Sequence, residues 1–274
     1  MKIKIFVFVL LFFCFLTFFI LGFIFSRKLL DGDCPEILEK KVFRVSFVSD
    51  IHAGSQDRRS MEQNTPGNVI YPADFVEFLP EALNEMKLEG VSLLVSLGDQ
   101  FNTPSLKYAQ VMKDIIDQSG MEVLWARGNH DKEDVINYLG INGTYFYEDY
   151  DNWRIIVLDT NDKSENDPYK EGITKKQLDW FREVSDTEKN IIVAMHHPVW
   201  DWDNAERIHP VYRPLIEEFE KKNVKYVFSG HLHLPWQKEK NGIEYVGMPA
   251  FLLEGMEGNY RTFDLLSYRW FWQE

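Results

Sequence analysis

Short runs of apolar and β-branched residues recur along the chain, and each run stops abruptly at polar side chains. Runs of this length, bounded by glycine or polar residues, are typical of strands that are buried in a sheet. They lie at 42–49, 91–97, 123–126, 191–195 and 224–228. The pattern therefore predicts five core strands.

Between these runs, apolar residues return at the spacing of amphipathic helices. The predicted helices are 72–89, 104–119, 132–139, 174–184 and 212–222, and glycine or proline stands at several of their ends. A hairpin is predicted at 144–148 and 153–158 around a turn at 149–152. Further strand-like runs follow at 243–246, 260–266 and 268–272.

Strands that alternate with helices imply βαβ units and parallel strands, and the late runs add antiparallel ones. We therefore predict an α/β fold with two packed, mixed β-sheets flanked by helices. The candidate functional residues described below all fall between 50 and 233, so a single domain over 42–274 is the simplest organisation.

The N-terminal region differs in kind, because residues 5–25 carry no charged side chain. As a helix this run spans roughly 30 Å, about the thickness of the hydrocarbon core of a bilayer. It ends in Ser26, Arg27 and Lys28 without the small residues of a cleavage site. We predict a single-pass membrane anchor at 1–28 and a linker at 29–41, with a removed signal peptide as the alternative. Basic residues flank both ends of the run, so the side of the membrane stays open.

Composition narrows the function classes. The formal net charge of the chain is −13, which argues against a nucleic-acid binder, because such proteins present a basic surface. The only two cysteines are Cys14 and Cys34, so the predicted domain has neither a disulfide framework nor a thiolate metal site.

The polar residues that follow the five core strands form a pattern of their own. Six of the seven histidines stand in these positions, and only His209 lies elsewhere. In open α/β sheets the ligand crevice lies outside the carboxyl ends of the strands, so these residues are expected to share one site. They are Asp50, His52, Asp99, Asn129, His130, His196, His197, His231 and His233.

This inventory offers oxygen and nitrogen donors, which suit divalent ions such as Mn, Zn or Fe. The donors are too many for one four-coordinate ion but sufficient for two ions that share a carboxylate. Two ions about 3.5–4 Å apart stabilise the attacking and leaving oxygens of a displacement at phosphorus. A metal-bound water also loses its proton near neutral pH, which supplies hydroxide as the nucleophile.

The order and content of the motifs resemble the calcineurin-like metallophosphoesterase superfamily, over roughly residues 43–266. The motifs are Asp50-x-His52, Gly98-Asp99, Gly128-Asn129-His130-Asp131, His196 and Gly230-His231-x-His233. The resemblance implies that Asp50, His52 and His233 bind one ion and that Asn129, His196 and His231 bind the other. It also implies that Asp99 bridges the two ions and that His130 contacts the phosphate and protonates the leaving oxygen. Neighbours in an extended segment point to opposite faces, so His197 is not expected to ligate beside His196.

Two departures from the motifs of particular branches indicate which branches of the superfamily the sequence resembles less. Asn102 stands where the protein Ser/Thr phosphatases have an aspartate, and the tyrosine expected after Asp99 in purple acid phosphatases is not evident. The sequence is more similar to the phosphodiesterase and purple acid phosphatase-like branches. Asn102 and Arg127 are substrate-binding candidates, and Arg127 has an ion pair near the sheet as its alternative.

These observations lead to one functional expectation. The chain is expected to be a membrane-anchored phosphoesterase that uses two divalent ions, identity open, on a phosphomonoester or a phosphodiester. The substrate is expected to be a small-molecule or lipid phosphate ester. The alternatives are a non-catalytic metal-binding scaffold and a lipid or sugar-lipid phosphoesterase with the same chemistry.

Overall fold

The structure is a computed structural model, and it describes residues 43–55, 59–60, 69–140, 144–161, 172–201, 204–266 and 269–272. The predicted anchor and linker lie outside these residues. Within them, no helix is both long enough and apolar enough to cross a bilayer. Residues 42–274 form one compact unit.

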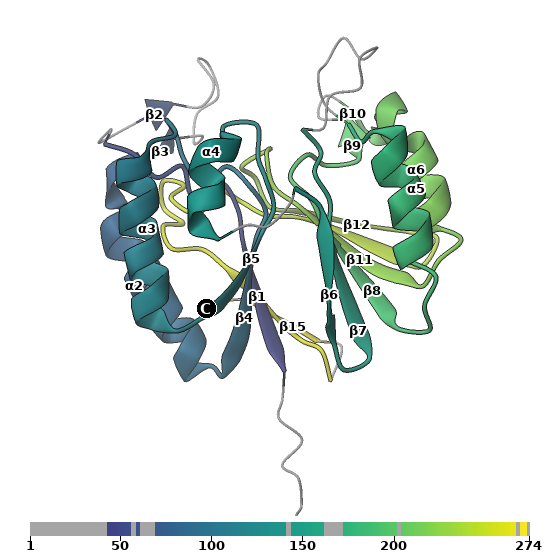
Figure 1. Cartoon of the computed structure of the whole chain (residues 1–274), viewed down its shortest axis with the longest axis horizontal. Helices are drawn as coiled ribbons and strands as arrows, with labels where there is room; N and C mark the ends of the chain where they lie inside the picture. The colour runs from purple at the N-terminus through teal and green to yellow at the C-terminus, as the bar shows by residue number, and fades with distance from the viewer. Residues whose placement is uncertain are drawn as a thin grey trace, which may run out of the picture. The chain divides into compact units, whose positions relative to one another are not determined.

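One half of this unit is built on a five-stranded sheet in the order β15-β14-β1-β4-β5 (Figure 1). Strands β1, β4 and β5 are parallel, with β5 at one edge, and β14 and β15 are added on the other side, each antiparallel to its neighbour. The strands are β1 (Arg44–Val48), β4 (Val91–Ser96), β5 (Glu122–Trp125), β14 (Arg261–Asp264) and β15 (Arg269–Trp272).

The other half is built on a six-stranded sheet in the order β12-β13-β11-β8-β7-β6. Here β7, β8, β11 and β13 are parallel, and the two edge strands β6 and β12 are antiparallel to their neighbours. The strands are β6 (Phe146–Tyr150), β7 (Trp153–Val157), β8 (Asn190–Ala194), β11 (Val224–Ser229), β12 (Trp236–Lys240) and β13 (Ile243–Gly247).

The inner faces of the two sheets pack against each other. Phe47 of β1 and Phe228 of β11 stack with their ring centroids 3.7 Å apart, at the contact between the sheets. Val95 of β4 and Ile155 of β7 belong to the same buried cluster and are fully shielded from solvent. This shared apolar layer joins the two halves into one domain, because burying it from water is the main favourable term in folding.

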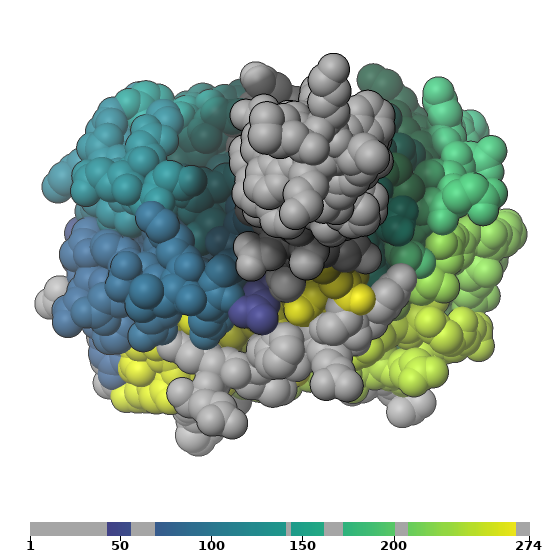
Figure 2. Space-filling model, turned by 90° about the horizontal axis from the view of Figure 1, so that it is seen from below, coloured from purple at the N-terminus to yellow at the C-terminus, as the bar shows by residue number. Residues whose placement is uncertain are grey.

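Helices cover the outer faces, so the unit has four layers (Figure 1). The first sheet is covered by η1 (Pro72–Asp74), α2 (Phe75–Leu88), α3 (Leu106–Ser119), α4 (Glu133–Ile136) and η2 (Asn137–Leu139), and the second by α5 (Lys175–Val184), η3 (Pro210–Tyr212) and α6 (Arg213–Phe219). Seen from below, the α2–α3 layer and the α5–α6 layer stand on opposite sides (Figure 2).

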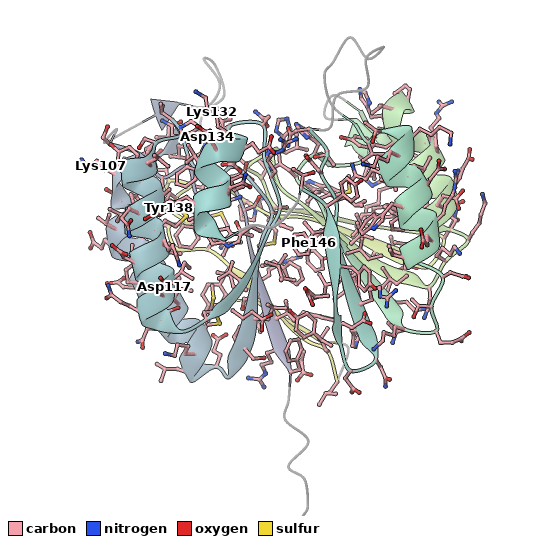
Figure 3. The ribbon with its side chains drawn as sticks, in the orientation of Figure 1. Lys107, Asp117, Lys132, Asp134, Tyr138 and Phe146 are labelled. Atoms are coloured by element: carbon pink, nitrogen blue, oxygen red, sulfur yellow. The ribbon has the colours of Figure 1, made fainter. Side chains whose placement is uncertain are left out.

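Local sequence explains where the longer helices begin and end. The Ser105 hydroxyl accepts the backbone N–H of Tyr108 at the start of α3, and Gly120 ends that helix with a φ of 66°. Its polar residues, such as Lys107 and Asp117, are exposed and point away from the sheet (Figure 3). The helix therefore presents one apolar face to β4 and β5.

The fold prediction is confirmed in its main statement, because two mixed sheets are flanked by helices. The predicted core strands and helices are all present, with ends shifted by one to a few residues. The strand β12 was not predicted, because four of its five residues are polar and every second side chain is exposed. The short strands β2 (Arg59–Ser60), β3 (Val69–Ile70), β9 (Trp200–Asp201) and β10 (Asn204–Ile208) were also not predicted.

Candidate functional site

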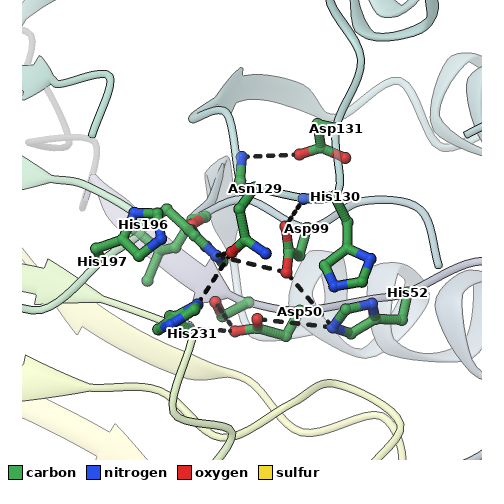
Figure 4. A network of polar contacts seen from close by, with 12 residues as sticks. Asp50, His52, Asp99, Asn129, His130, Asp131, His196, His197 and His231 are labelled. Atoms are coloured by element: carbon green, nitrogen blue, oxygen red, sulfur yellow. Dashed lines mark hydrogen bonds and ion pairs between the residues drawn. The ribbon is translucent and has the colours of Figure 1, made fainter. Parts of the chain in front are cut away.

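The parallel strands of both sheets deliver their carboxyl ends to one place. Asp50 and His52 follow β1, Asp99 follows β4, Asn129 and His130 follow β5, His196 follows β8, and His231 and His233 follow β11. The structure brings all eight of these predicted residues together, with Asp50 and Asp99 between two sets of imidazole rings (Figure 4).

The first group of donors is Asp50, His52 and His233. Nε2 of His233 lies 3.2 Å from Oδ1 of Asp50 and 3.2 Å from Nε2 of His52. Nε2 of His52 lies 3.8 Å from the same Asp50 oxygen. Asp50 and His52 are 0% exposed and His233 is 4% exposed, so this group lies inside the domain.

The second group of donors is Asn129, His196 and His231. Oδ1 of Asn129 lies 3.0 Å from Nε2 of His196 and 3.0 Å from Nδ1 of His231. His196 is fully buried, whereas Asn129 is exposed and His231 is half-buried. The second group therefore lies nearer to the surface than the first.

Asp99 connects the two groups through a single oxygen. Its Oδ2 lies 3.6 Å from Nε2 of His52 and 3.5 Å from Nε2 of His196. Its other oxygen accepts the backbone N–H of His130 at 2.8 Å, which fixes the orientation of the carboxylate. One atom of Asp99 is thus within reach of an ion in either group.

These spacings fit divalent ions. Nitrogen and oxygen ligands stand about 2.0–2.2 Å from zinc, so two ligands of one tetrahedral ion are about 3.4 Å apart. The donor atoms within each group, with Asp99 included, are separated by 3.0–3.8 Å. The donor set, made of carboxylate, amide and imidazole, also suits such ions.

The backbone at the site is unusual. Asp50, His52, Asp99, His231 and His233 all have a positive φ, between 50° and 69°. Non-glycine residues rarely adopt this conformation, which costs of order 1–3 kcal/mol each when it is held by its surroundings. The turns after the strands are therefore shaped to present side chains rather than to satisfy local preference.

Two glycines allow these turns to pack closely. A Cβ at Gly128 would overlap the backbone nitrogen and carboxylate of Asp99, and a Cβ at Gly230 would overlap the Ser49 hydroxyl. The Ser49 hydroxyl donates to Oδ2 of Asp50 at 2.5 Å, and the backbone N–H of His231 donates to the same oxygen at 2.9 Å. The turn after β11 is thereby tied to the turn after β1, and Oδ1 of Asp50 faces the first group.

The protonation of the carboxylates favours cation binding. Burial by itself would raise the pKa of Asp50, but the interactions with His233 and His196 together outweigh it and hold this pKa well below the usual range. Burial acts in the same direction on Asp99, where the interactions with His196 and His52 together hold the pKa well below its usual value. Both carboxylates are therefore charged at neutral pH.

The histidines divide into two kinds. Burial lowers the pKa of His52 to about 3 and the pKa of His231 to about 3, so both are neutral at pH 7. Burial would also lower the pKa of His196, but Asp99 and Asp50 together outweigh it and raise this pKa to about 10. A cation in the second group therefore has to displace a proton from His196.

His130 stands beside the first group. Its ring centroid lies 5.0 Å from that of His52, with the rings nearly perpendicular. Its Nδ1 lies 3.2 Å from the backbone carbonyl oxygen of Asn102, which accepts the proton of this nitrogen. The backbone of Asn102 thus provides an acceptor for His130, although its side chain is not charged.

A buried network joins the turn after β4 to the turn after β5. Asp131 accepts the backbone N–H groups of Gln100 at 2.9 Å, Gly128 at 2.9 Å and Phe101 at 3.3 Å. The Gln100 side chain donates to Asp131 at 3.1 Å and to the carbonyl oxygen of Ala126 at 2.8 Å. Asp131 therefore orients Asn129 and His130, which precede it.

Arg127 forms an ion pair near the sheet, which was the alternative to a role in substrate binding. Its Nη2 lies 2.5 Å from Oδ2 of Asp159, and its Nε donates to Oδ1 of Asp159 at 3.3 Å. Asp159 is 1% exposed, so the ion pair is largely buried. The structure places Arg127 in this pair, near the site but engaged with the protein itself.

The premise that His197 points away from His196 does not hold in the structure, whereas the expectation that His197 does not ligate stays a prediction. The two ring centroids are 4.9 Å apart, and the His197 ring lies 4.4 Å from that of His231. Both histidines follow β8 where the chain bends, so the alternation of an extended strand does not apply. Sequence reasoning also missed Asp159, Thr160 and Asn161, although they follow the predicted strand at 153–158 as the other site residues follow theirs.

Comparisons with known proteins agree with this geometry. The family model of the calcineurin-like phosphoesterases matches residues 43–235. The chain is 24% identical over 215 residues to a protein of Fibrobacter succinogenes named a probable cyclic nucleotide phosphodiesterase, covering 72% of this chain and 75% of that protein. It is 22% identical over 250 residues to the 3′,5′-cyclic adenosine monophosphate phosphodiesterase CpdA of Haemophilus influenzae, covering 85% of each.

The fold is also found in solved structures. A dimetal phosphatase from Danio rerio superimposes with a TM-score of 0.66 at 14% identity, covering 81% of this chain and 92% of that one. The matched residues 43–235 contain all seven predicted metal donors and His130. The protein is thus a metal-dependent phosphoric ester hydrolase that uses two divalent ions, and it belongs to the calcineurin-like phosphoesterase family.

Proposed function

We propose that this protein hydrolyses a phosphodiester bond in a small molecule, with a cyclic nucleotide as the favoured substrate class. The observation that carries the proposal is the single Asp99 oxygen that lies within 3.6 Å of a donor in each group. A bridged pair of ions suits the displacement of one oxygen by another at phosphorus. The choice of cyclic nucleotides is supported by the names of two relatives that match most of the chain.

In this proposal each donor group holds one ion. Asp50, His52 and His233 bind the first ion, Asn129, His196 and His231 bind the second, and Asp99 touches both. When bound, the two ions supply an activated water and neutralise charge on the phosphate. The donor spacings and the ionised state of both carboxylates support this assignment.

His130 has a separate role, as the residue that meets the ester. The Asn102 carbonyl holds its Nδ1 proton, so Nε2 is the nitrogen that is left to contact the substrate. One ring nitrogen of His130 lies within 4.8 Å of donor atoms of His52 and Asp99. We assign His130, in the imidazolium form with a proton on each ring nitrogen, the donation of its Nε2 proton to the departing oxygen, with its ring orientation fixed by the backbone.

The test uses the purified full-length chain, freed of metal and reloaded with Mn²⁺. Hydrolysis of bis(p-nitrophenyl) phosphate, p-nitrophenyl phosphate and 3′,5′-cyclic AMP is compared under identical conditions. We expect turnover of the diester and of cyclic AMP to exceed that of the monoester. Faster turnover of the monoester would reject the phosphodiesterase assignment, and binding of two ions with no turnover of any ester would favour a metal-binding scaffold.

We also propose that residues 5–25 hold the enzyme at a membrane. The support is the uncharged apolar run in the sequence. The structure does not describe these residues. Fractionation of cells that produce the full chain, or a chain that begins at Asp31, tests the proposal. We expect the full chain in the membrane fraction after an alkaline wash, and recovery of both chains in the soluble fraction would reject the anchor.

A further inference from the structure

Residues 158–161 follow β7 and reach the site from a strand that supplies none of the proposed ligands. Within this segment, Oγ1 of Thr160 lies 2.8 Å from Nδ1 of His197 and accepts the backbone N–H of His197 at 3.1 Å. Thr160 is 0% exposed and His197 is 1% exposed. One buried hydroxyl therefore holds both the backbone and the ring of His197.

The His197 ring lies against the second donor group. Its centroid is 4.4 Å from that of His231 and 4.9 Å from that of His196. One donor atom from each of these three histidines lies within 4.8 Å of the others, and the close-up shows the three rings gathered on one side of the site (Figure 4). A shift of His197 would therefore be felt by His231, the half-buried ligand.

The same segment holds the turn that presents Asn129. Asp159 forms the ion pair with Arg127, and the Asn161 side chain donates to the backbone carbonyl of Arg127 at 2.8 Å. Arg127 precedes Asn129 by two residues in the chain. Asn129, which is exposed, and His231, which is half-buried, are thus each contacted through an intermediate residue that residues 158–161 hold.

The segment is itself fixed to the second sheet and its helix. The Gln177 side chain of α5 accepts the backbone N–H of Asp159 at 2.8 Å and donates to its carbonyl oxygen at 2.9 Å. Gln177 is 0% exposed. The segment can therefore act as a rigid support, because its own backbone is bonded to the core.

We propose that residues 158–161 form a positioning element for the second divalent ion. Thr160 acts through His197 on His231, and Asp159 acts through Arg127 on Asn129. Residues that orient metal ligands from outside typically affect metal affinity by about 10–100-fold when they are removed. The proposal rests on the two-ion assignment of the site and does not depend on which ester is hydrolysed.

His197 is assigned to positioning and not to ligation for a geometric reason. Oδ1 of Asn129 is already 3.0 Å from a nitrogen of His196 and 3.0 Å from a nitrogen of His231. With Asp99 at 3.5 Å from His196, these donors surround a position for the second ion without His197. The Thr160 hydroxyl contacts Nδ1 of His197. Residues outside the ligand set typically fix the orientation of imidazole rings through such contacts.

The experiment measures metal binding directly. The full-length chain is freed of metal and titrated with Mn²⁺ by calorimetry, as wild type, Thr160→Val and Thr160→Ser. We expect Thr160→Val to bind the first ion as the wild type does and the second about 10–100-fold more weakly, with Thr160→Ser close to the wild type. The serine variant retains the hydroxyl, so it separates the hydrogen bond from the shape of the side chain.

A matched control removes a buried threonine hydroxyl elsewhere. Thr262 on β14 is 2% exposed and bonds to the Ser46 hydroxyl at 2.8 Å and to Glu89 at 3.3 Å. Thr262→Val should leave the affinity for both ions unchanged. Equal weakening of both ions in Thr160→Val, or the same selective loss in Thr262→Val, would overturn the proposal.

Two further variants complete the test. Asp159→Asn, which removes the charge that pairs with Arg127, should also weaken the second ion selectively. His197→Ala should match Thr160→Val, whereas loss of the second ion in His197→Ala with wild-type binding in Thr160→Val would make His197 a ligand and reject the positioning role. A wild-type chain that binds two ions but hydrolyses no diester would reject the proposed function alone. One that binds no Mn²⁺ would reject the positioning element as well.

Discussion

The two donor groups use similar residues but lie at different depths in the domain. In the first group every member is buried, and Asp50 is held by the Ser49 hydroxyl and by the backbone of the β11 turn. In the second group only His196 is fully buried, while Asn129 is exposed and His231 is half-buried. The fold itself fixes the first group, whereas the second needs support from residues outside it.

The difference extends to charge. His52 of the first group is neutral at pH 7 because burial lowers its pKa to about 3. His196 of the second group is protonated, because Asp99 and Asp50 together outweigh the effect of burial and raise its pKa to about 10. The first group is therefore ready for a cation, and the second exchanges a proton for one.

The largest effect is expected where the groups meet. Asp99→Ala removes the oxygen common to both groups, and hydrolysis of a diester should fall by about a thousandfold, which corresponds to about 4 kcal/mol of lost charge stabilisation. Steady-state rates with saturating Mn²⁺ provide the measurement. Asp117→Ala on the exposed face of α3 is the control and should keep full activity. An Asp99→Ala enzyme with more than about a tenth of wild-type activity would contradict a shared carboxylate.

A smaller effect separates the groups by depth. When the loaded enzyme is mixed with a chelator, the ion of the exposed second group should leave about tenfold faster than the ion of the buried first group, because solvent reaches its ligands. His231→Ala should abolish the fast phase and retain the slow one. Release in a single phase from the wild type, with both ions leaving together, would show that depth does not distinguish the groups.

Proton release sharpens the comparison further. At pH 7.5, loading the metal-free protein with two ions should release the proton of His196, whose metal-free pKa is about 10, in addition to any proton lost by metal-bound water. Calorimetry in two buffers with different heats of ionisation measures the number of protons released. His196→Gln should release about one proton fewer than the wild type and His52→Gln should release the same number, because His52 carries no proton at this pH. The reverse result would exchange the two assignments.

The smallest expected effect concerns Asn102. Because its backbone carbonyl contacts His130, Asn102→Ala should change kcat by less than about threefold, or under about 0.7 kcal/mol. A loss of a hundredfold would show that the amide side chain contacts the substrate, as one of the sequence expectations held. The separate changes in kcat and KM of this variant would then show whether the contact is made in the ground state or only in the transition state.

Most of the fold could be predicted because its core strands are continuous apolar runs. The strand at 224–228 can be predicted from its own residues. The polar residues that follow it, His231 and His233, indicate the site. The edge strand β12 cannot be predicted in this way, because only Trp236 among its residues is apolar. This strand is specified by its pairing with β13. Edge strands owe their conformation to the neighbour more than to their own composition.

The clustering of the candidate donors could be predicted from sequence, the role of each donor stays a prediction, and the contacts that support the donors could not be predicted. Each donor stands directly after a strand, so local pattern is sufficient to find it. The partner of Arg127 is Asp159, and the partner of His197 is Thr160, residues that are more than 30 positions away in the chain. The residues near Arg127 in the sequence do not distinguish an arginine that binds a phosphate from one that pairs with a buried carboxylate. Only the structure shows which of the two contacts is made.

The left-handed backbone of the site has a consequence for how the sequence can change. Among the residues that the structure describes, seven non-glycine residues have a positive φ; five are proposed ligands, and the other two, Asp151 and Asn241, lie in hairpin turns. Glycine at a ligand position would relax the chain while abolishing the donor. Random drift therefore leads easily from this enzyme to an inactive descendant with the same fold and greater stability, and only selection for hydrolysis opposes that drift.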